Sequence, residues 1–321
     1  MSRIQRSCRF TAASLVLCLL TALPASAAAP LGIVNDTTAD LLNLRLDNGR
    51  EVSFIRLDMP PGGQDDMENP QEVCDIRADF GLGLANFHAV PLKEVQRLVF
   101  CAEHPACLKL ERPGYAASHL RGKYRSLLPQ PGDTPVCHFE QFRPGMTMEE
   151  VCTLLPADTL RDDNDAILTS LGFAGQLWAA RLSPAHPQST ASARKGGPAT
   201  LGHLELRQPL SGQKLQALLQ HLYRQGYAPW QAELPGIDMD FAEMADLGLE
   251  RHKSLLEEAL RHLMEAGTGE ATVMLAPAAM LPLLADADAP QQDVQLFTLT
   301  LRQTSRTLIV DVAAYQAGKQ L

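Results

Sequence analysis

Short alternating segments separated by turn sequences occupy the chain from residue 31 to about residue 111. Residues 42–46 alternate apolar and polar side chains, and residues 52–57 follow Asp47-Asn48-Gly49, a strong hairpin-turn sequence. Residues 74–80 alternate in the same way, and residues 98–100 are the last predicted strand of this part. Strands of this length at ~10-residue spacing are typical of a small sandwich. We therefore predict an antiparallel β-sandwich domain over residues 30–112.

Helix signals first appear in the second half of the chain. Thr147 and Glu150 have the spacing of a capping box, and Ser211 precedes a segment with leucines on one helical face. Asp240 with Glu243 predicts the start of a further helical region. That region ends at Gly267, and residues 176–182, 201–207, 272–275, 294–300 and 307–312 read as strands.

The fold class that these patterns predict is α+β. We expect a signal peptide at residues 1–27, the β-sandwich at 30–112, a proline-marked connector at 113–137 and an α+β domain of hairpins and amphipathic helices at 138–321. A split of this last domain into two units near residues 233–238 is an open alternative.

The N-terminus has the features of a secretory leader. Three arginines within the first nine residues precede an apolar run at 12–23, which is followed by Pro24 and Ala25-Ser26-Ala27. The run is shorter than the ~20 residues that cross a bilayer, and Leu17 is too bulky for a lipid-attachment motif at Cys18. We predict export to a bacterial periplasm with cleavage after Ala27, and no transmembrane segment in the mature chain.

Composition excludes several classes of protein. The 321 residues are 45% hydrophobic and 20% charged, which is ordinary for a globular protein. The formal net charge of −9 disfavours nucleic acid as a partner, and 5% aromatic residues are few for a site that stacks on sugars or bases. We expect no cofactor, and the oligomeric state stays open.

Seven cysteines are present, and Cys8 and Cys18 leave with the leader. In an oxidising compartment the other five predict two disulfides and one spare thiol. Cys152 is on the apolar side of the predicted helix after Thr147, so we expect it to be the buried free thiol. Three pairings remain open for the other four, which are Cys74, Cys101, Cys107 and Cys137.

The same cysteines permit a metal site as an alternative. Cys101, His104, Cys107 and His138 offer thiolates and imidazoles at spacings that a metal could use. Export favours disulfides, however, and C-x-x-H-x-x-C matches no common zinc pattern. We therefore assign no metal ligands and keep these four residues as the alternative.

The first part resembles a family of small, uncharacterised β-sandwich domains of exported bacterial proteins. The resemblance is carried by Ile33-Val34-Asn35-Asp36-Thr37, Pro61-Gly62, Cys74-Asp75-Ile76-Arg77 and Cys101. It implies a disulfide between Cys74 and Cys101, and on that basis the preferred second pair is Cys107 with Cys137.

A second, local resemblance covers residues 142–156. Gly145-Met146-Thr147-Met148-Glu149-Glu150-Val151 resembles the opening of the BamE/SmpA-like family of small outer-membrane-assembly lipoproteins and their periplasmic relatives. This resemblance implies a setting in envelope assembly.

Catalytic patterns are weak. Ser192 with Lys195 and Ser211 with Lys214 fit S-x-x-K without the companion motifs, and helix capping explains Ser211. The acidic run at 162–165 lacks the glycine and distal glutamate of an EF-hand. We assign no catalytic residues and predict a non-enzymatic module that binds another envelope protein. An enzyme whose residues converge only in the folded chain is the alternative.

Leader removal gives the first prediction. The protein purified from the periplasm should begin at Ala28, because signal peptidase cleaves after the small residues at 25 and 27. Intact-mass measurement checks this. A mature protein that keeps residues 1–27 would contradict the predicted export signal.

Overall fold

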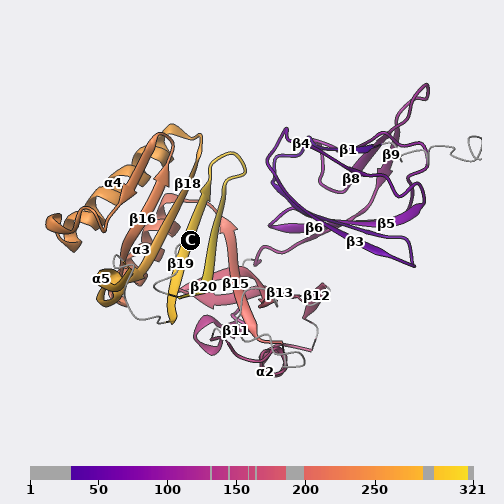
Figure 1. The fold of residues 1–321 in the computed structure, drawn as a ribbon. Helices are drawn as coiled ribbons and strands as arrows, with labels where there is room; N and C mark the ends of the chain where they lie inside the picture. Colours follow the sequence, from indigo (N-terminus) through magenta and orange to yellow (C-terminus); the bar gives the residue numbers. More distant parts are fainter. Residues whose placement is uncertain are drawn as a thin grey trace, which may run out of the picture.

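The computed structural model describes residues 30–316 apart from residues 131, 144, 158, 163–164, 186–198 and 285–292. The predicted leader therefore lies outside the described residues. Strands dominate, and they form three sheets with a few helices (Figure 1). This composition agrees with the α+β class. No described helix has the length and apolarity needed to cross a membrane.

Two five-stranded sheets form the N-terminal part. The strands of the first, in spatial order, are β4 (Gln64–Glu68), β1 (Pro30–Asn35), β7 (Arg97–Phe100), β8 (Cys107–Glu111) and β9 (Ser118–Arg121). Those of the second are β10 (Lys123–Ser126), β6 (Gly83–Pro91), β5 (Val73–Asp79), β2 (Leu41–Asp47) and β3 (Val52–Met59). All neighbours pair antiparallel except β1 and β7, which are parallel.

Both sheets contribute side chains to one apolar core. Ile33 and Leu98 from the first sheet and Leu44 and Ile76 from the second belong to the same buried cluster. Along β2, core-facing leucines alternate with half-buried polar residues, as the period-two sequence pattern requires. The predicted hairpin at Asp47-Asn48-Gly49 is confirmed, because β2 and β3 pair on either side of it. Strands β9 and β10 lie within the predicted connector, so these sheets extend to residue 126.

A third, ten-stranded sheet forms the C-terminal part. Its longest strands make two meanders, and the pairing of β15 with β20 joins them. The first meander contains β13 (Asp165–Phe173), β14 (Gln176–Pro184) and β15 (Leu201–Pro209), and the second contains β18 (Glu270–Pro277), β19 (Asp293–Arg302) and β20 (Thr307–Gln316). The remaining strands are β11 (Cys137–His138), β12 (Leu160–Asp162), β16 (Tyr227–Leu234) and β17 (Ile237–Asp240).

Two amphipathic helices cover one face of this sheet (Figure 1). Leu218 and Leu222 of α3 (Gly212–Arg224) and Leu260 of α4 (Leu249–Ala266) are buried in the C-terminal core. The shorter helices are α2 (Met148–Leu154) and α5 (Leu281–Leu284), with 3-10 turns η1 (Phe139–Gln141), η2 (Ala245–Leu247) and η3 (Ala278–Met280).

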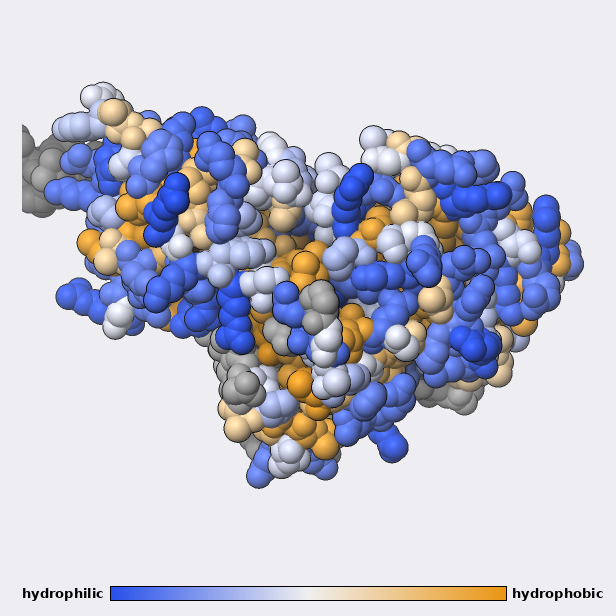
Figure 2. All heavy atoms as spheres, turned by 180° about the vertical axis from the view of Figure 1, so that it is seen from behind, coloured by the Kyte–Doolittle hydropathy of each residue, from blue (hydrophilic) through white to orange (hydrophobic). Residues whose placement is uncertain are grey.

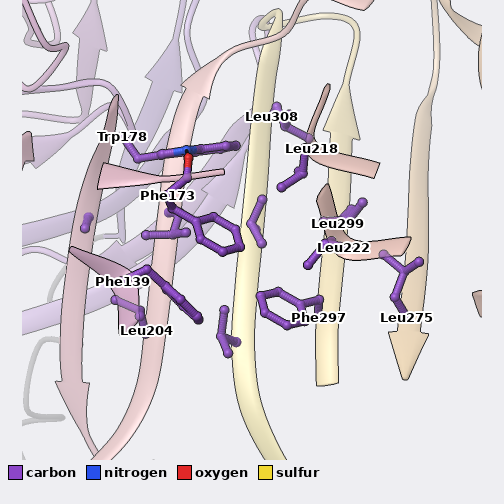
Figure 3. Close-up of a cluster of buried hydrophobic side chains, with 14 of the residues drawn as sticks. Phe139, Phe173, Trp178, Leu204, Leu218, Leu222, Leu275, Phe297, Leu299 and Leu308 are labelled. Atoms are coloured by element: carbon purple, nitrogen blue, oxygen red, sulfur yellow. Dashed lines mark hydrogen bonds between the residues drawn. The ribbon is translucent and has the colours of Figure 1, made fainter. Parts of the chain in front are cut away.

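Aromatic rings at the centre of the core join the two meanders. The ring of Phe173 on β13 stacks on that of Phe297 on β19, with ring centroids 5.8 Å apart (Figure 3). The indole Nε1 of the buried Trp178 donates a hydrogen bond of 3.0 Å to the carbonyl oxygen of Phe173. The only polar atom of the indole is therefore satisfied inside the core.

The helix signals had mixed outcomes. The capping box at Thr147 and Glu150 and the Ser211 cap are both confirmed. The predicted helix start at Asp240 is wrong, because residues 237–240 form β17 and α4 begins only at Leu249. The Asp240 carboxylate accepts the backbone N–H of Ala242, so its capping chemistry makes a turn there instead of a helix start.

Candidate functional site

The two parts of the chain meet through an apolar contact. Leu84 on β6 and Leu127 share a buried cluster with Ile167 on β13 and Ala179 on β14. Because side chains alternate along a strand, Ile167 and Ala179 point away from the core that α3 and α4 cover. The second N-terminal sheet therefore packs on the opposite face of the ten-stranded sheet.

A buried ion cluster lies beside this contact. Asp79, at the end of β5, has a side chain only 4% exposed and pairs with Arg181 of β14 and Arg207 of β15. Its carboxylate also accepts the backbone N–H of Gly81 and a side-chain N–H of Asn43 on β2. Both arginines come from the C-terminal sheet, so the ion cluster joins the two parts of the protein.

The arginines determine the charge state of Asp79. Burial alone would raise the pKa of this carboxyl, but Arg207 and Arg181 outweigh burial and hold it below its ordinary value. The neighbouring Glu205 also pairs with Arg207, yet burial raises the pKa of Glu205 above its ordinary value. The two arginines therefore favour the anionic form of the buried Asp79.

A second polar contact lies at the turn between β19 and β20. Asp40, in the loop between β1 and β2, accepts hydrogen bonds from Arg302 at 3.2 Å and from the Ser305 hydroxyl at 2.7 Å. The β19–β20 hairpin extends toward the N-terminal sheets (Figure 1). Two separate charged contacts therefore fix the orientation of the two parts.

The cysteine loop between β7 and β8 is the site that the sequence singled out. The sulfur atoms of Cys101 and Cys107 and a carboxylate oxygen of Glu103 lie within 4.8 Å of one another. Burial, together with the neighbouring Cys107, raises the pKa of the Cys101 thiol to about 12. Two thiols and one carboxylate are a donor set that a soft divalent metal could use.

The two histidines of the alternative metal set do not belong to this group of ligand atoms. His104 lies in the loop, but its Nδ1 accepts the backbone N–H of Ala106 at 2.9 Å. His138 is on β11 of the ten-stranded sheet, paired with Gly172. Glu103 takes part instead. The position of Glu103 between the two cysteines could have suggested it as a ligand from the sequence. No spacing pattern, however, distinguishes a metal-binding carboxylate in an exposed turn from an ordinary one.

The five described cysteines are free thiols, and the pairs Cys74–Cys101 and Cys107–Cys137 stay predictions. The sulfur atoms of Cys101 and Cys107 lie within 4.8 Å of each other. Cys74 is opposite Val90 in the second sheet, and the Cys137 thiol donates to the carbonyl oxygen of Leu154 in the C-terminal core. Cys152, which was predicted to be the buried free thiol, is half-buried.

The weaker catalytic candidates stay apart from these sites. The Ser211 hydroxyl accepts the backbone N–H of Lys214, which is the capping role predicted for it. Ser192 and Lys195 lie outside the described residues, as do residues 163–164 of the acidic run. The ends of that run, Asp162 and Asp165, pair across the β12–β13 hairpin.

Strand β3 forms a free edge of the second N-terminal sheet. Val52 and Phe54 are opposite Asp47 and Arg45 of β2, and they are 45% and 52% exposed. On the other face, Ile55 and Leu57 are half-buried against the N-terminal core. Apolar side chains therefore lie on both faces of a strand that has one unpaired edge. The alternating sequence pattern alone did not reveal this.

The surface also has a groove and a region where apolar atoms gather. A groove of about 490 Å³ runs beside β1 and β4 and is lined by Asp65, Asp66 and Arg97 among others. Seen from the opposite side, apolar atoms gather at the lower end of the molecule, at the level of β11 and α2 (Figure 2). Half-buried Met146 and Met148 there form the outer layer of the C-terminal core.

Comparison with known proteins gave no match to a protein family, to a curated protein or to a solved structure.

Replacing Asp79 tests the ion cluster. Asp79→Asn should lower the free energy of unfolding at neutral pH by about 1–3 kcal/mol, because Arg181 and Arg207 both lose an anionic partner while Glu205 still pairs with Arg207. Asp75→Asn on the same strand removes an exposed carboxylate and should change it by less than about 0.5 kcal/mol. Urea unfolding measures the free energy of unfolding of both variants. Equal changes in the two variants would contradict a stabilising role of the ion cluster.

The pH dependence supplies an independent check on the same variant. The folded pKa of Asp79 is depressed, so its contribution is complete above the unfolded value of about 4 and is lost as pH falls through the folded pKa. The stability difference between wild type and Asp79→Asn should therefore shrink toward low pH. A difference that stays constant below pH 4 would show that the charge of Asp79 is unimportant.

Proposed function

We propose that this protein is an exported, non-enzymatic binding module of the bacterial envelope, and that it takes an extended segment of a partner protein by strand addition at β3. The observation that carries the proposal is the unpaired edge of β3, on which Val52, Phe54, Ile55 and Leu57 are apolar. The leader at residues 1–27 and the local likeness to envelope-assembly lipoproteins support the periplasmic setting.

Backbone geometry makes such an edge a binding surface. One side of an edge strand presents unpaired N–H and C=O groups, and an extended peptide can satisfy them by adding a strand. The alternating side chains of that peptide would cover Val52 and Phe54 on one face and Ile55 and Leu57 on the other. Main-chain bonds would supply affinity, and these two apolar pairs would supply selectivity.

The other edges of the N-terminal sheets are less suited to this role. β3 has eight residues, whereas β4 has five and β9 and β10 have four each. β4 carries Asp65, Asp66 and Glu68, and charges of this kind discourage pairing at an edge. β3 also carries two charged residues, Arg56 and Asp58, but these pair with each other, and the strand is the longest of the four edges.

The sheets around β3 provide a packed support for the proposed binding edge. We infer that the two N-terminal sheets form a β-sandwich, since each contributes apolar side chains to one core. β3 pairs with β2, whose Asn43 donates to the buried Asp79. The binding edge is thereby connected to the contact that holds the C-terminal sheet.

Site-specific crosslinking in the periplasm tests the proposal. A photoreactive phenylalanine analogue at position 54 should give a reproducible adduct with one partner, because a strand added at β3 would lie against this side chain. The same analogue at Tyr115, which is 71% exposed and distant from β3 in sequence and sheet, serves as the control. Equal adducts at both positions would contradict binding at the edge.

A matched pair of lysine variants sharpens the result. Val52→Lys, on the same face as position 54, should reduce the adduct about tenfold, which corresponds to about 1.4 kcal/mol of binding free energy. Val136→Lys, at a valine of similar exposure in the C-terminal part, should leave it unchanged. An adduct that is insensitive to Val52→Lys would show that the partner does not use β3.

A further inference from the structure

We propose that Cys101 and Cys107 form a disulfide across the end of the β7–β8 hairpin, made by exchange with an external disulfide. This pairing differs from both pairs expected from the sequence. It does not depend on the strand-addition function, since it concerns the opposite sheet of the N-terminal part.

The register of the hairpin places the two cysteines face to face. Phe100 pairs with Leu108, so Cys101 and Cys107 are the next pair of residues toward the loop. The Cys101 N–H donates a hydrogen bond of 2.9 Å to the Cys107 carbonyl oxygen. Directly opposed residues of an antiparallel pair have Cα atoms about 4.5–5.5 Å apart, which is inside the range of about 4.4–6.8 Å that disulfides require. The bond therefore needs side-chain rotation and no rearrangement of the strands.

The intervening loop is held in place by its own hydrogen bonds. The Cys107 N–H donates to the carbonyl oxygen of His104 at 2.9 Å, and the Ala106 N–H donates to the His104 ring. The Ala106 carbonyl oxygen accepts the N–H of Gly122, which follows β9. Three contacts thus keep Cys107 opposite Cys101 before any bond is made.

The difference in exposure sets the order of the reaction. Cys107 is half-buried and Cys101 is buried, so the Cys107 thiolate attacks the external disulfide, forms a mixed disulfide and releases one external thiolate. Cys101 then loses its proton and attacks the Cys107 sulfur, which releases the second external thiolate. Two protein thiols are oxidised, and one external disulfide is reduced to two thiols.

The remaining described thiols do not compete for this bond. Cys137 donates to the Leu154 carbonyl oxygen inside the C-terminal core, and Cys74 lies in β5 opposite Val90. Cys152 is on α2 in the C-terminal part. Among the described residues, only Cys101 and Cys107 fall in one compact group of thiol and carboxylate ligand atoms.

Peptide mapping after glutathione equilibration tests the pairing. The folded full chain is incubated with oxidised glutathione, alkylated and digested with trypsin, which leaves both cysteines in the single peptide 98–109. The expected result is that this peptide carries no alkyl label and is lighter by two hydrogen atoms, while Cys152 is labelled after denaturation. A peptide 98–109 labelled at both cysteines would overturn the proposal.

Two variants test the order of reaction. Cys101→Ser should trap glutathione on Cys107, because the mixed disulfide can no longer be resolved, whereas Cys152→Ser should leave the 98–109 bond unchanged. A crosslink from peptide 98–109 to the peptide of Cys74 or Cys137 would overturn the pairing. Stoichiometric zinc on the purified protein that is lost in both Cys101→Ser and Glu103→Gln would overturn it in favour of a metal centre.

Discussion

The buried carboxylate of Asp79 pairs with two arginines of the other part and is the main charged contact between the two parts of this protein. Removing a charge from water costs several kcal/mol unless opposite charges compensate, and the compensating charges on Arg181 and Arg207 belong to the other part. Within the C-terminal part Glu205 pairs with Arg207, and Asp79 adds an anionic partner from the other part for both arginines. The apolar contact of Leu84 and Leu127 with Ile167 and Ala179 excludes water beside the ions, which strengthens their attraction.

The position of Asp79 links this contact to the proposed binding edge. Asp79 is on β5, its neighbour β2 donates through Asn43, and β3 is the next strand outward. The second contact, from Asp40 to Arg302 and Ser305, lies at a different loop and opposes rotation about the first. A partner strand added at β3 would therefore meet an edge that has a fixed direction relative to the ten-stranded sheet.

Local signals in the sequence predicted local structure well. The Asp47-Asn48-Gly49 turn, the Thr147 capping box and the Ser211 cap act within four residues, and each forms as expected. The helix start at Asp240 failed because an aspartate side chain serves a turn as readily as a helix N-terminus.

Contacts between distant residues could not be predicted in this way. Asp79 reads as an ordinary polar position of an alternating strand, and its partners lie more than a hundred residues away in the sequence. The predicted disulfide pairing rested on a resemblance, whereas the hairpin register places the positions of Cys101 and Cys107 opposite each other. The unpaired edge of β3 likewise follows from the strand order in the sheet. An alternating sequence pattern predicts a strand, but it does not say which strands will lie at the edge.

Differential scanning calorimetry of the mature chain tests the coupling of the two parts most directly. If the Asp79 cluster makes them one cooperative unit, the protein should unfold in a single transition whose calorimetric and van't Hoff enthalpies agree, and Asp79→Asn should split that transition in two. Two separate transitions in the wild-type protein would contradict the coupling and show that the parts fold independently.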